Sequence, residues 1–568
     1  MKDAAFSSAR LLRLYDRISD ADDAIPRLRR FVLDLAVRGK LVEQEAADEP
    51  AAELLKRIAK EKAKKGAKPA TTRSTSDPAA FEIPMGWAWT TLAGVSTVTM
   101  GQSPPGETYN TSGDGVPLIN GPVEFTAGPF GLTVVNQYTT APTNFCEKGD
   151  LLICVRGSTT GRTNVADFRA CIGRGVAAIH SSFDDGFVRL FIWKARYDII
   201  EMGRGIAFPS VSKKQIEDLA FPLPPLAEQQ RIVAKVDELM ALCDRLQQAR
   251  TGREALRDRL TTASLTRLTA PETGADATYE TFQPHARFAL QALPTLTTRP
   301  AQIKTLRQTI LNLAVRGRLV AQDAADEPAA ELLKRIEFQT SQTAKTRDGK
   351  RETLEPSLSA ADEQFQIPPT WKWVRLASLA EKITDGEHLS PNKTSSGMPL
   401  LTAVHVTGRG LTFENPQFVS VEDGRKFRQR CDPRRGDILI CSRGTIGRCA
   451  VVDVEEIFCL MGSVILVRLP TLCLPEYFNY FLLTERAQEQ MRGMSGATAV
   501  QALYLKDIRH CPLPLPPLAE QHRIVARVDA LMALCDQLET SLTTTATTRS
   551  RLLEALLHEA LAPAMEAA

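Results

Sequence analysis

One long stretch of this 568-residue chain occurs twice. Residues 28–58 and 306–336 are identical at 24 of 31 positions, and residues 222–247 recur in closely similar form at 514–539. Shared composition does not produce identity of this length. A repeat spaced by about 280 to 290 residues indicates duplication of a whole domain and not a solenoid. The chain therefore consists of two copies of one unit, whose repeated parts frame two dissimilar inserts.

The repeated parts that come first in each copy are expected to be helical. Leu28, Val32 and Leu35 lie on one face at a period of 3.6 residues. Gly39 is expected to end this helical segment, and Pro50 to stand in the first turn of the next. The lysine-rich run that follows, from Lys60 through residue 68, indicates a solvated polar linker, with phosphate contact as the alternative.

The repeated parts that close each copy have apolar residues spaced by four and three, which is a heptad seam. The seam consists of Ile232, Val236, Leu239, Cys243 and Leu246 in the first copy, and of Ile524, Val528, Leu531, Cys535 and Leu538 in the second. This predicts long helices over residues 226–268 and 518–561. We expect each to pair with the first helix of the other copy, which closes a circular, pseudo-two-fold frame of antiparallel coiled-coil helices.

The predicted fold class is α+β, with two α/β inserts between the helical regions. The expected divisions are a helical region and linker (1–80), a first insert (81–223), a central helical region (224–345) with a connector at 270–300, a linker and second insert (346–513), and a closing helix (514–568). Each insert opens with a tryptophan pair, Trp87 and Trp89 or Trp371 and Trp373. Alternation predicts that both members of a pair lie on one face of a short strand and pack into the core.

Composition narrows the class of protein. The net charge is only +3, so a nucleic-acid surface must be local. The eleven cysteines form no CxxC, which favours reduced thiols over a disulfide framework or a zinc site. The first residues lack the apolar core of a signal peptide, and no apolar run is long enough to span a membrane. We expect a cytoplasmic protein.

The motif LAVRGKLV with DEPA, which recurs as LAVRGRLV with DEPA, and the motif PLPPLAEQ with RIV each occur twice around two variable inserts. In this order they resemble the DNA specificity subunit of type I restriction-modification systems, over about residues 20 to 565. The resemblance implies that each insert reads one half of a bipartite, asymmetric DNA target. It also implies that the helices set the spacing and dock two methyltransferase subunits, and that restriction subunits join this core.

Several loop residues are candidates for contact with base edges or phosphates. Asn and Gln pair with adenine, and acids accept from cytosine N4, although ordinary turn chemistry explains such residues equally well. The candidates lie in two loops at equivalent places, just beyond the tryptophan pairs, and in a short segment of the first insert: Gln102, Tyr109, Asn110, Asn120, Asp385, Glu387 and His388.

Basic residues form the second group of candidates. Six positive charges fall within about eleven residues of the second insert, which favours phosphate contact over a merely solvated face. They are Arg425, Lys426, Arg428, Arg430, Arg434 and Arg435. Matched strand ends in the two inserts place Arg156, Arg162, Arg443 and Arg448 either for backbone contact or for capping the strand. Lys213, Lys214 and Lys506 are further candidates near the insert ends.

Catalytic machinery is not evident in the sequence. Ser103 to Gly106 departs from the pattern of amino-methyltransferases, residues 157–163 depart from a phosphate loop, and seven scattered histidines form no metal motif. We expect no catalytic residue, no metal site and no cofactor bound by this chain. The complex is expected to use S-adenosylmethionine, ATP and Mg²⁺ on its other subunits. The alternatives are a coiled-coil scaffold whose inserts bind proteins, and an autonomous nuclease.

Overall fold

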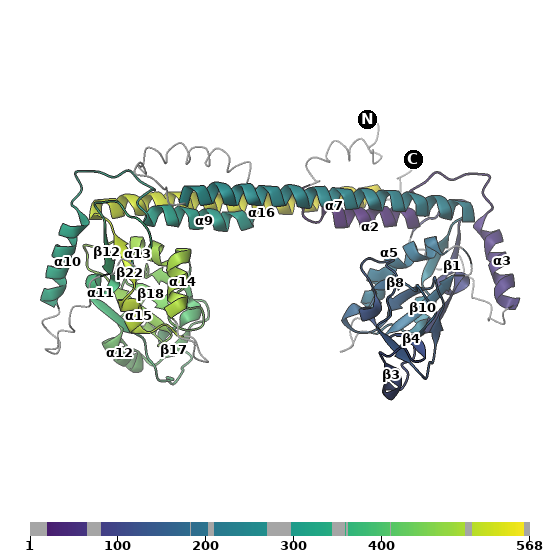
Figure 1. Ribbon diagram of the computed structural model, residues 1–568, viewed down its shortest axis with the longest axis horizontal. Coiled ribbons are helices and arrows are strands. Elements are labelled where there is room, and N and C mark those ends of the chain that lie inside the picture. The colour runs from purple at the N-terminus through teal and green to yellow at the C-terminus, as the bar shows by residue number, and fades with distance from the viewer. Residues whose placement is uncertain are drawn as a thin grey trace. The chain divides into compact units, whose positions relative to one another are not determined.

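A computed structural model describes residues 20–64, 81–181, 183, 185–202, 210–269, 297–343, 358, 362–408, 410–494 and 502–561 (Figure 1). The chain forms two compact units. Unit 1 comprises residues 1–252 with 546–568, and unit 2 comprises residues 253–545. The fold is α+β, as expected. In the described part of the chain, no helix combines the length and apolar character that crossing a membrane requires.

The described residues of the insert in unit 1 form three sheets. A two-stranded sheet pairs β1 (Ala88–Thr91) with β11 (Ala220–Leu223), and so joins the two ends of the insert. A four-stranded sheet has the order β2 (Ser96–Met100), β10 (Val176–Ser181), β7 (Leu151–Cys154), β8 (Thr163–Val165). A five-stranded sheet has the order β3 (Tyr109–Asn110), β5 (Gln137–Thr139), β4 (Val116–Ile119), β9 (Ala170–Ile172), β6 (Phe145–Cys146). Its helices are α2 (Ala24–Val37), α3 (Ala51–Lys64), α4 (Leu92–Val95), α5 (Gly186–Met202), α6 (Lys213–Glu217), the first part of α7 (Leu226–Thr269) and the end of α16 (Leu518–Leu561).

Unit 2 repeats this plan with a different outer part. The pair β12 (Lys372–Arg375) and β22 (Pro512–Leu515) joins the ends of the insert, and the four-stranded sheet has the order β13 (Lys382–Asp385), β21 (Val464–Arg468), β18 (Ile438–Cys441), β19 (Cys449–Val451). The remaining strands form a three-stranded sheet and a hairpin. The sheet has the order β17 (Gln417–Val419), β14 (Met398–Leu401), β20 (Cys459–Leu460), and the hairpin pairs β15 (Val406–Thr407) with β16 (Gly410–Leu411). Its helices are the end of α7, α9 (Pro300–Val315), α10 (Ala329–Thr343), α11 (Leu376–Leu379), α12 (Val421–Arg430), α13 (Pro475–Leu482), α14 (Glu485–Met494), α15 (Leu505–Arg509) and most of α16 (Leu518–Leu561).

The helix expected to end near Gly39 does so, and its repeat ends in the same way. Gly39 has φ +66° and Gly317 has φ +67°, a backbone conformation that suits glycine. A Cβ at either position would lie 2.4 Å from Cγ of a proline in the insert, Pro84 or Pro368. The repeated Arg-Gly therefore turns the chain where the insert packs closely against it.

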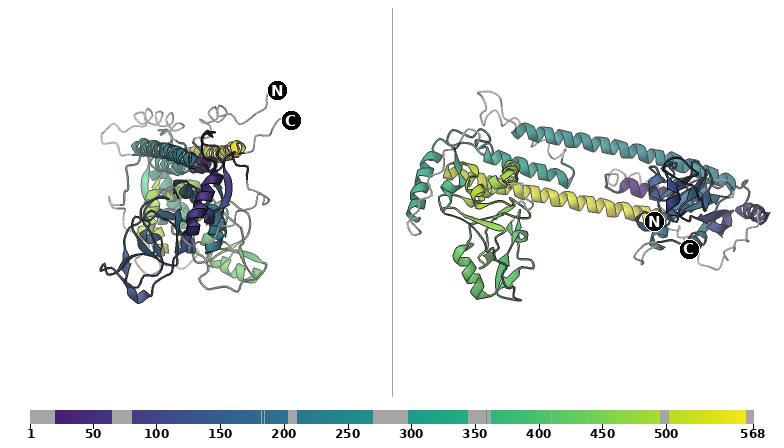
Figure 2. Two further views of the ribbon diagram at one scale, coloured as in Figure 1. Left: turned by 90° about the vertical axis from the view of Figure 1, so that its right-hand side faces the viewer. Right: turned by 60° about the horizontal axis from the view of Figure 1, so that its bottom comes forward.

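The long helices expected from the heptad spacing are present and bury that seam. In unit 1, Ile232 and Val236 of α7 pack with Val32 and Ala36 of α2. The beginning of α2 also contacts the last part of α16 through Leu556. In unit 2, α9 packs against the end of α7 through Leu265, Leu268 and Leu313, and against α16, so that it lies between the two long helices (Figure 2). Each first helix thus contacts the closing helices of both copies.

The tryptophan pair of the second insert is buried as predicted, since Trp371 and Trp373 are each 6% exposed, although Trp371 precedes the strand β12. The pair of the first insert differs from the prediction. The strand β1 begins at Ala88, after Trp87, which lies buried against the α2–α7 core. Trp89 is only half-buried and contacts the ring of Phe81 at 5.2 Å. Trp87 sits in the turn because its indole N–H donates to Glu228 at 2.9 Å, a contact that strand periodicity does not encode.

The lysine-rich run does not begin as a solvated linker. Lys62 lies in α3, and its Nζ donates to the carbonyls of Ala93 at 2.6 Å and Ser96 at 2.8 Å. Burial lowers the pKa of Lys62 to about 8. The run after residue 64 lies outside the described residues, as do residues 1–19, most of the connector at 270–300 and most of the linker at 346–361. All eleven cysteines are buried and free, as expected for reduced thiols.

Candidate nucleic-acid interface

The two candidate loops leave their sheets at equivalent places. The amide of Gln102 donates to Ile172 on β9 at 2.9 Å, and the amide of Glu387 donates to Leu460 on β20 at 2.8 Å. The glycine before each passes against the backbone of that neighbouring strand, because a Cβ on Gly101 or Gly386 would lie 2.2 Å from a carbonyl oxygen. The same backbone anchor therefore presents two unlike loops.

In the first insert the candidate side chains differ in availability. Gln102 is exposed. The hydroxyl of Tyr109 donates to the carbonyl of Pro104 at 3.2 Å. Asn110 closes a turn, since its Oδ1 accepts from the amide of Asp114 and its Nδ2 donates to the Asp114 carbonyl. Asn120 is half-buried and lies over Gly173. Turn chemistry thus accounts for Asn110, while Gln102 presents a free amide.

The matched arginines fall into two structural roles. Arg162 donates to the carbonyl of Phe125 at 3.1 Å, and Arg448 donates to Val406 at 3.5 Å. Each therefore ties its strand end to a neighbouring segment. Arg156 and Arg443 occupy corresponding places one loop earlier, and both residues are exposed. Arg162 and Arg448 thus cap the backbone of their inserts, whereas Arg156 and Arg443 are exposed.

The three candidate lysines lie on short helices beside these exposed arginines. Lys213 and Lys214 belong to α6, which follows the Val155–Val211 backbone hydrogen bond of 2.9 Å. Lys506 belongs to α15, which follows the equivalent Ser442–Leu503 bond. All three lysines are exposed, and Lys213 is 3.6 Å from Glu217. Each insert therefore places a lysine-bearing helix close to one outward arginine.

The six positive charges of the second insert have more acidic neighbours than the sequence indicates. Lys426 is 3.1 Å from Glu422, Arg434 is 2.6 Å from Asp432, and Arg435 is 3.0 Å from Glu455. Arg428 is half-buried and donates to the carbonyl of Phe458 at 2.6 Å. Arg425 is exposed. Exposed ion pairs contribute only about 0–1 kcal/mol, so phosphate can replace these partners, but Arg428 has a structural role.

Three candidates meet at the outer end of unit 2, where α12 lies farthest from α9 and α16 (Figure 1). Arg430 at the end of α12 contacts both Asp385 and His388, and His388 Nε2 lies 2.9 Å from Asp385 Oδ2. The Asp385 side chain is 13% exposed, against 46% for His388 and 53% for Arg430. Asp385 is therefore occupied and does not stand free for a base. It orients two exposed donors instead.

Sequence reasoning missed the charges that support this end of the insert. Lys382 is 2.6 Å from Asp432, and Arg468 is 2.7 Å from Asp437. Burial raises the pKa of Asp432, but the hydrogen bond from Lys382 and the charges of Arg468 and Arg434 together lower it to about 2. In the first insert, Arg174 was also missed. It is exposed, and its amide donates to Ser103 at 3.1 Å, beside the candidate loop.

Comparison with known proteins gives consistent results. A family model for the type I restriction modification DNA specificity domain matches residues 84–252 and 368–547. The type I restriction enzyme EcoEI specificity subunit of Escherichia coli is 30% identical over 578 residues, covering 94% of each chain. The EcoAI specificity subunit of the same organism is 29% identical, also with 94% of each chain covered. The crystal structure of the HsdS subunit from Thermoanaerobacter tengcongensis aligns with 86% of this chain and 99% of its own at 19% identity and a TM-score of 0.42.

Proposed function

Because this chain belongs to the family of type I restriction-modification DNA specificity proteins, we propose that it reads the DNA target for a complex of that type. Each insert would read one half of a bipartite, asymmetric sequence. Two unlike ligands are expected for two unlike inserts on a repeated frame. Catalysis would then belong to partner subunits and not to this chain.

The observation that carries this proposal is that each insert combines an arginine at a matched position with a neighbouring loop whose residues differ between the inserts. Arg156 and Arg443 are outward cations at the same place in each fold, as sequence-independent phosphate contacts require. The loops beside them differ, with Gln102 in one insert and the His388–Arg430 pair in the other. Arginine at base edges favours guanine and glutamine favours adenine, so the two inserts have different chemistry for readout.

Partner docking is supported by surface residues that the duplication has kept identical. Glu53, Lys56 and Arg57 on α3 are exposed, as are their counterparts Glu331, Lys334 and Arg335 on α10. Core packing does not require identity at exposed positions. One type of partner that binds once to each copy does require it. We therefore expect two methyltransferase subunits, with restriction subunits joining them in a nuclease complex.

The finer parts of the mechanism follow from the same family. The chain itself would bind no cofactor, and the complex would use S-adenosylmethionine, ATP and Mg²⁺ in the cytoplasm. The helices α7 and α16 would form an antiparallel, circularly closed frame that sets the spacing between the half-sites. A helical frame suits this because its length is fixed at about 1.5 Å per residue.

A domain exchange tests the proposal. Residues 81–223 are replaced by the corresponding insert of a relative, and the chain is expressed with its methyltransferase subunit. Long-read sequencing of the host genome then maps modified adenines. We expect one half of the modified sequence to change and the other half to stay. Unchanged methylation would exclude reading by the inserts and favour the protein-binding scaffold.

A further inference from the structure

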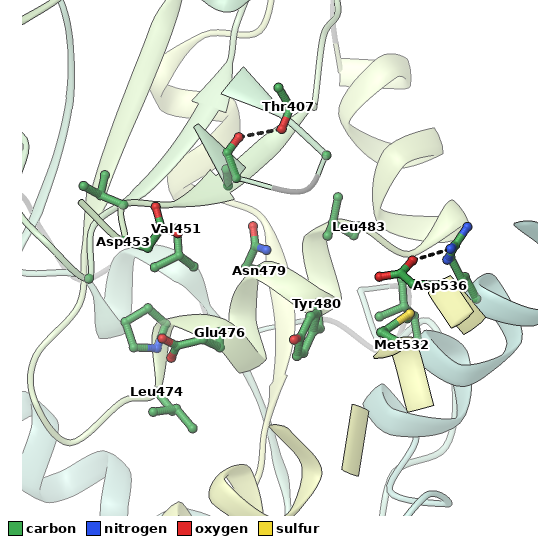
Figure 3. A pocket seen from close by; sticks show the side chains of 18 of the residues that line it. Thr407, Val451, Asp453, Leu474, Glu476, Asn479, Tyr480, Leu483, Met532 and Asp536 are labelled. Atoms are coloured by element: carbon green, nitrogen blue, oxygen red, sulfur yellow. Dashed lines mark hydrogen bonds and ion pairs between the residues drawn. The ribbon is translucent and has the colours of Figure 1, made fainter. Parts of the chain in front are cut away.

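A large pocket lies within unit 2, between the helices α9, α13 and α16 and the β15–β16 hairpin. Its volume is about 1260 Å³. Figure 3 shows Asn479 and Tyr480 on α13 and Leu483 directly after its end, together with Thr407 and Val451 from the strands. The lining is mixed, with apolar side chains beside carboxylates. It includes Arg435 of the basic candidates but no residue of the two candidate base-reading loops.

The wall contributed by α13 contains two acceptors without donors. Glu476 Oε2 and Asn479 Oδ1 are buried and accept no hydrogen bond from the described residues. Three cations line the pocket. Arg307 is 2.5 Å from Asp536 and Arg435 is 3.0 Å from Glu455, whereas Lys304 is exposed and forms no ion pair with the described residues. A buried acceptor left without a donor is unfavourable, and more so when it is charged. The wall is therefore suited to a positively charged donor from elsewhere.

The duplication shows what occupies the same place in unit 1. Trp87 contacts Phe187 edge-on at 6.0 Å, and Trp371 contacts Tyr477 edge-on at 6.1 Å, so Phe187 and Tyr477 are equivalent. Arg189 and Asn479, which lie two residues after Phe187 and Tyr477, are therefore equivalent. Trp193 and Leu483, which lie six residues after them, are equivalent in the same way.

In unit 1 these larger residues make contacts that their counterparts do not. Arg189 donates to the carbonyl of Gly149 at 2.9 Å, and the matching Gly436 of unit 2 lines the pocket. Trp193 packs edge-on against Phe130 at 5.4 Å. In unit 2, Asn479 and Leu483 are shorter, and Gly408 and Gly410 also line the pocket. Among the described residues, the second copy thus lacks one guanidinium contact and one aromatic contact of the first.

We propose that this pocket binds an arginine and a neighbouring aromatic side chain presented by a partner protein. The guanidinium has donors in a planar fork, which suits the Glu476 carboxylate and the Asn479 amide. The aromatic ring occupies the apolar space that Trp193 and Phe130 occupy in unit 1. Because only unit 2 has the shorter residues, the site distinguishes the second copy from the first on a frame whose repeated parts are otherwise closely similar.

The test uses the full-length chain and the dipeptide acetyl-Phe-Arg-amide, with binding followed by ligand-observed NMR and calorimetry. Acetyl-Phe-citrulline-amide has the same shape without the charge, and agmatine has the guanidinium without the ring. We expect both to bind at least about tenfold more weakly, the factor for 1.4 kcal/mol. Glu476→Gln should weaken binding about tenfold, whereas Glu489→Gln on α14 should not. The double variant Asn479→Arg with Leu483→Trp should abolish binding.

Other outcomes overturn the proposal. Equal binding of the citrulline peptide shows that no cation is recognised. Equal binding of agmatine shows a small-cation site and not a protein-docking site. Residue 409 is an arginine between two lining glycines, so Arg409→Ala is measured alongside. If the dipeptide binds only that variant, the occupant is the chain's own arginine and the partner assignment is wrong. None of these measurements involves DNA, so their failure leaves the proposed DNA reading untouched.

Discussion

Replacing Trp371 with Phe should loosen the second insert from its helices. The indole N–H of Trp371 donates to Glu520 Oε2 at 2.8 Å, and Gln322 donates to the other carboxylate oxygen. Glu520 is 1% exposed and stands in the first turn of α16, so the three residues join the insert, the loop after α9 and the closing helix. A hydrogen bond to a buried charged group contributes about 1.5–3 kcal/mol. Trp371→Phe should lower the free energy of unfolding by at least that amount.

The destabilisation caused by Trp371→Phe should depend on pH in a definite direction. Burial raises the pKa of Glu520 despite the hydrogen bonds from Trp371 and Gln322 that lower it. A raised carboxyl pKa means that its protonated form favours folding. That contribution is complete below the unfolded pKa near 4.5 and is lost as pH rises through the folded value. Removing the Trp371 donor raises the folded pKa further, so the destabilisation by Trp371→Phe should shrink between pH 7.5 and pH 5.5.

Urea unfolding followed by far-UV circular dichroism measures both effects. Trp373→Phe is the size-matched control, because Trp373 is also 6% exposed but donates only to the carbonyl of Phe365 at 3.3 Å. A double-mutant cycle with Glu520→Ala isolates the pair. Additivity of Trp371→Phe and Glu520→Ala within about 0.5 kcal/mol would refute the reasoning. Trp87→Phe removes the equivalent bond in unit 1 and assigns the transition of each unit.

Two further predictions concern charge. The double substitution of Arg156 and Arg443 by Ala should weaken binding to duplexes of any sequence. It should also reduce the slope of log K against log salt by about two, one for each lost phosphate contact, as measured by a filter-binding or anisotropy titration. An unchanged slope would place these arginines away from the DNA backbone. Because the pKa of Lys62 is lowered to about 8, the unfolded chain binds more protons between about pH 8 and 10.5, so the free energy of unfolding should rise with pH across that window, and this rise should vanish in Lys62→Met.

The sequence by itself determined the duplication, the helices and the equivalence of the two inserts. Ile232, Val236 and Cys243 belong to a seam of apolar residues spaced by three and four positions. This spacing is a local property of the sequence, so the seam could be predicted without a structure. The turn at Gly39 was equally local. The family resemblance rested on motifs of the same repeated helical parts, and the family model and relatives agree with it.

Only the tertiary structure decided which charges are free. Arg430 meets Asp385 from 45 positions away, and Arg428 reaches the carbonyl of Phe458 across 30. Such pairs depend on how strands and helices are brought together, and no local period encodes them. The pocket beside Asn479 was hidden for the same reason. It results from the absence of side chains that the other copy supplies, and a missing contact leaves no pattern in a sequence.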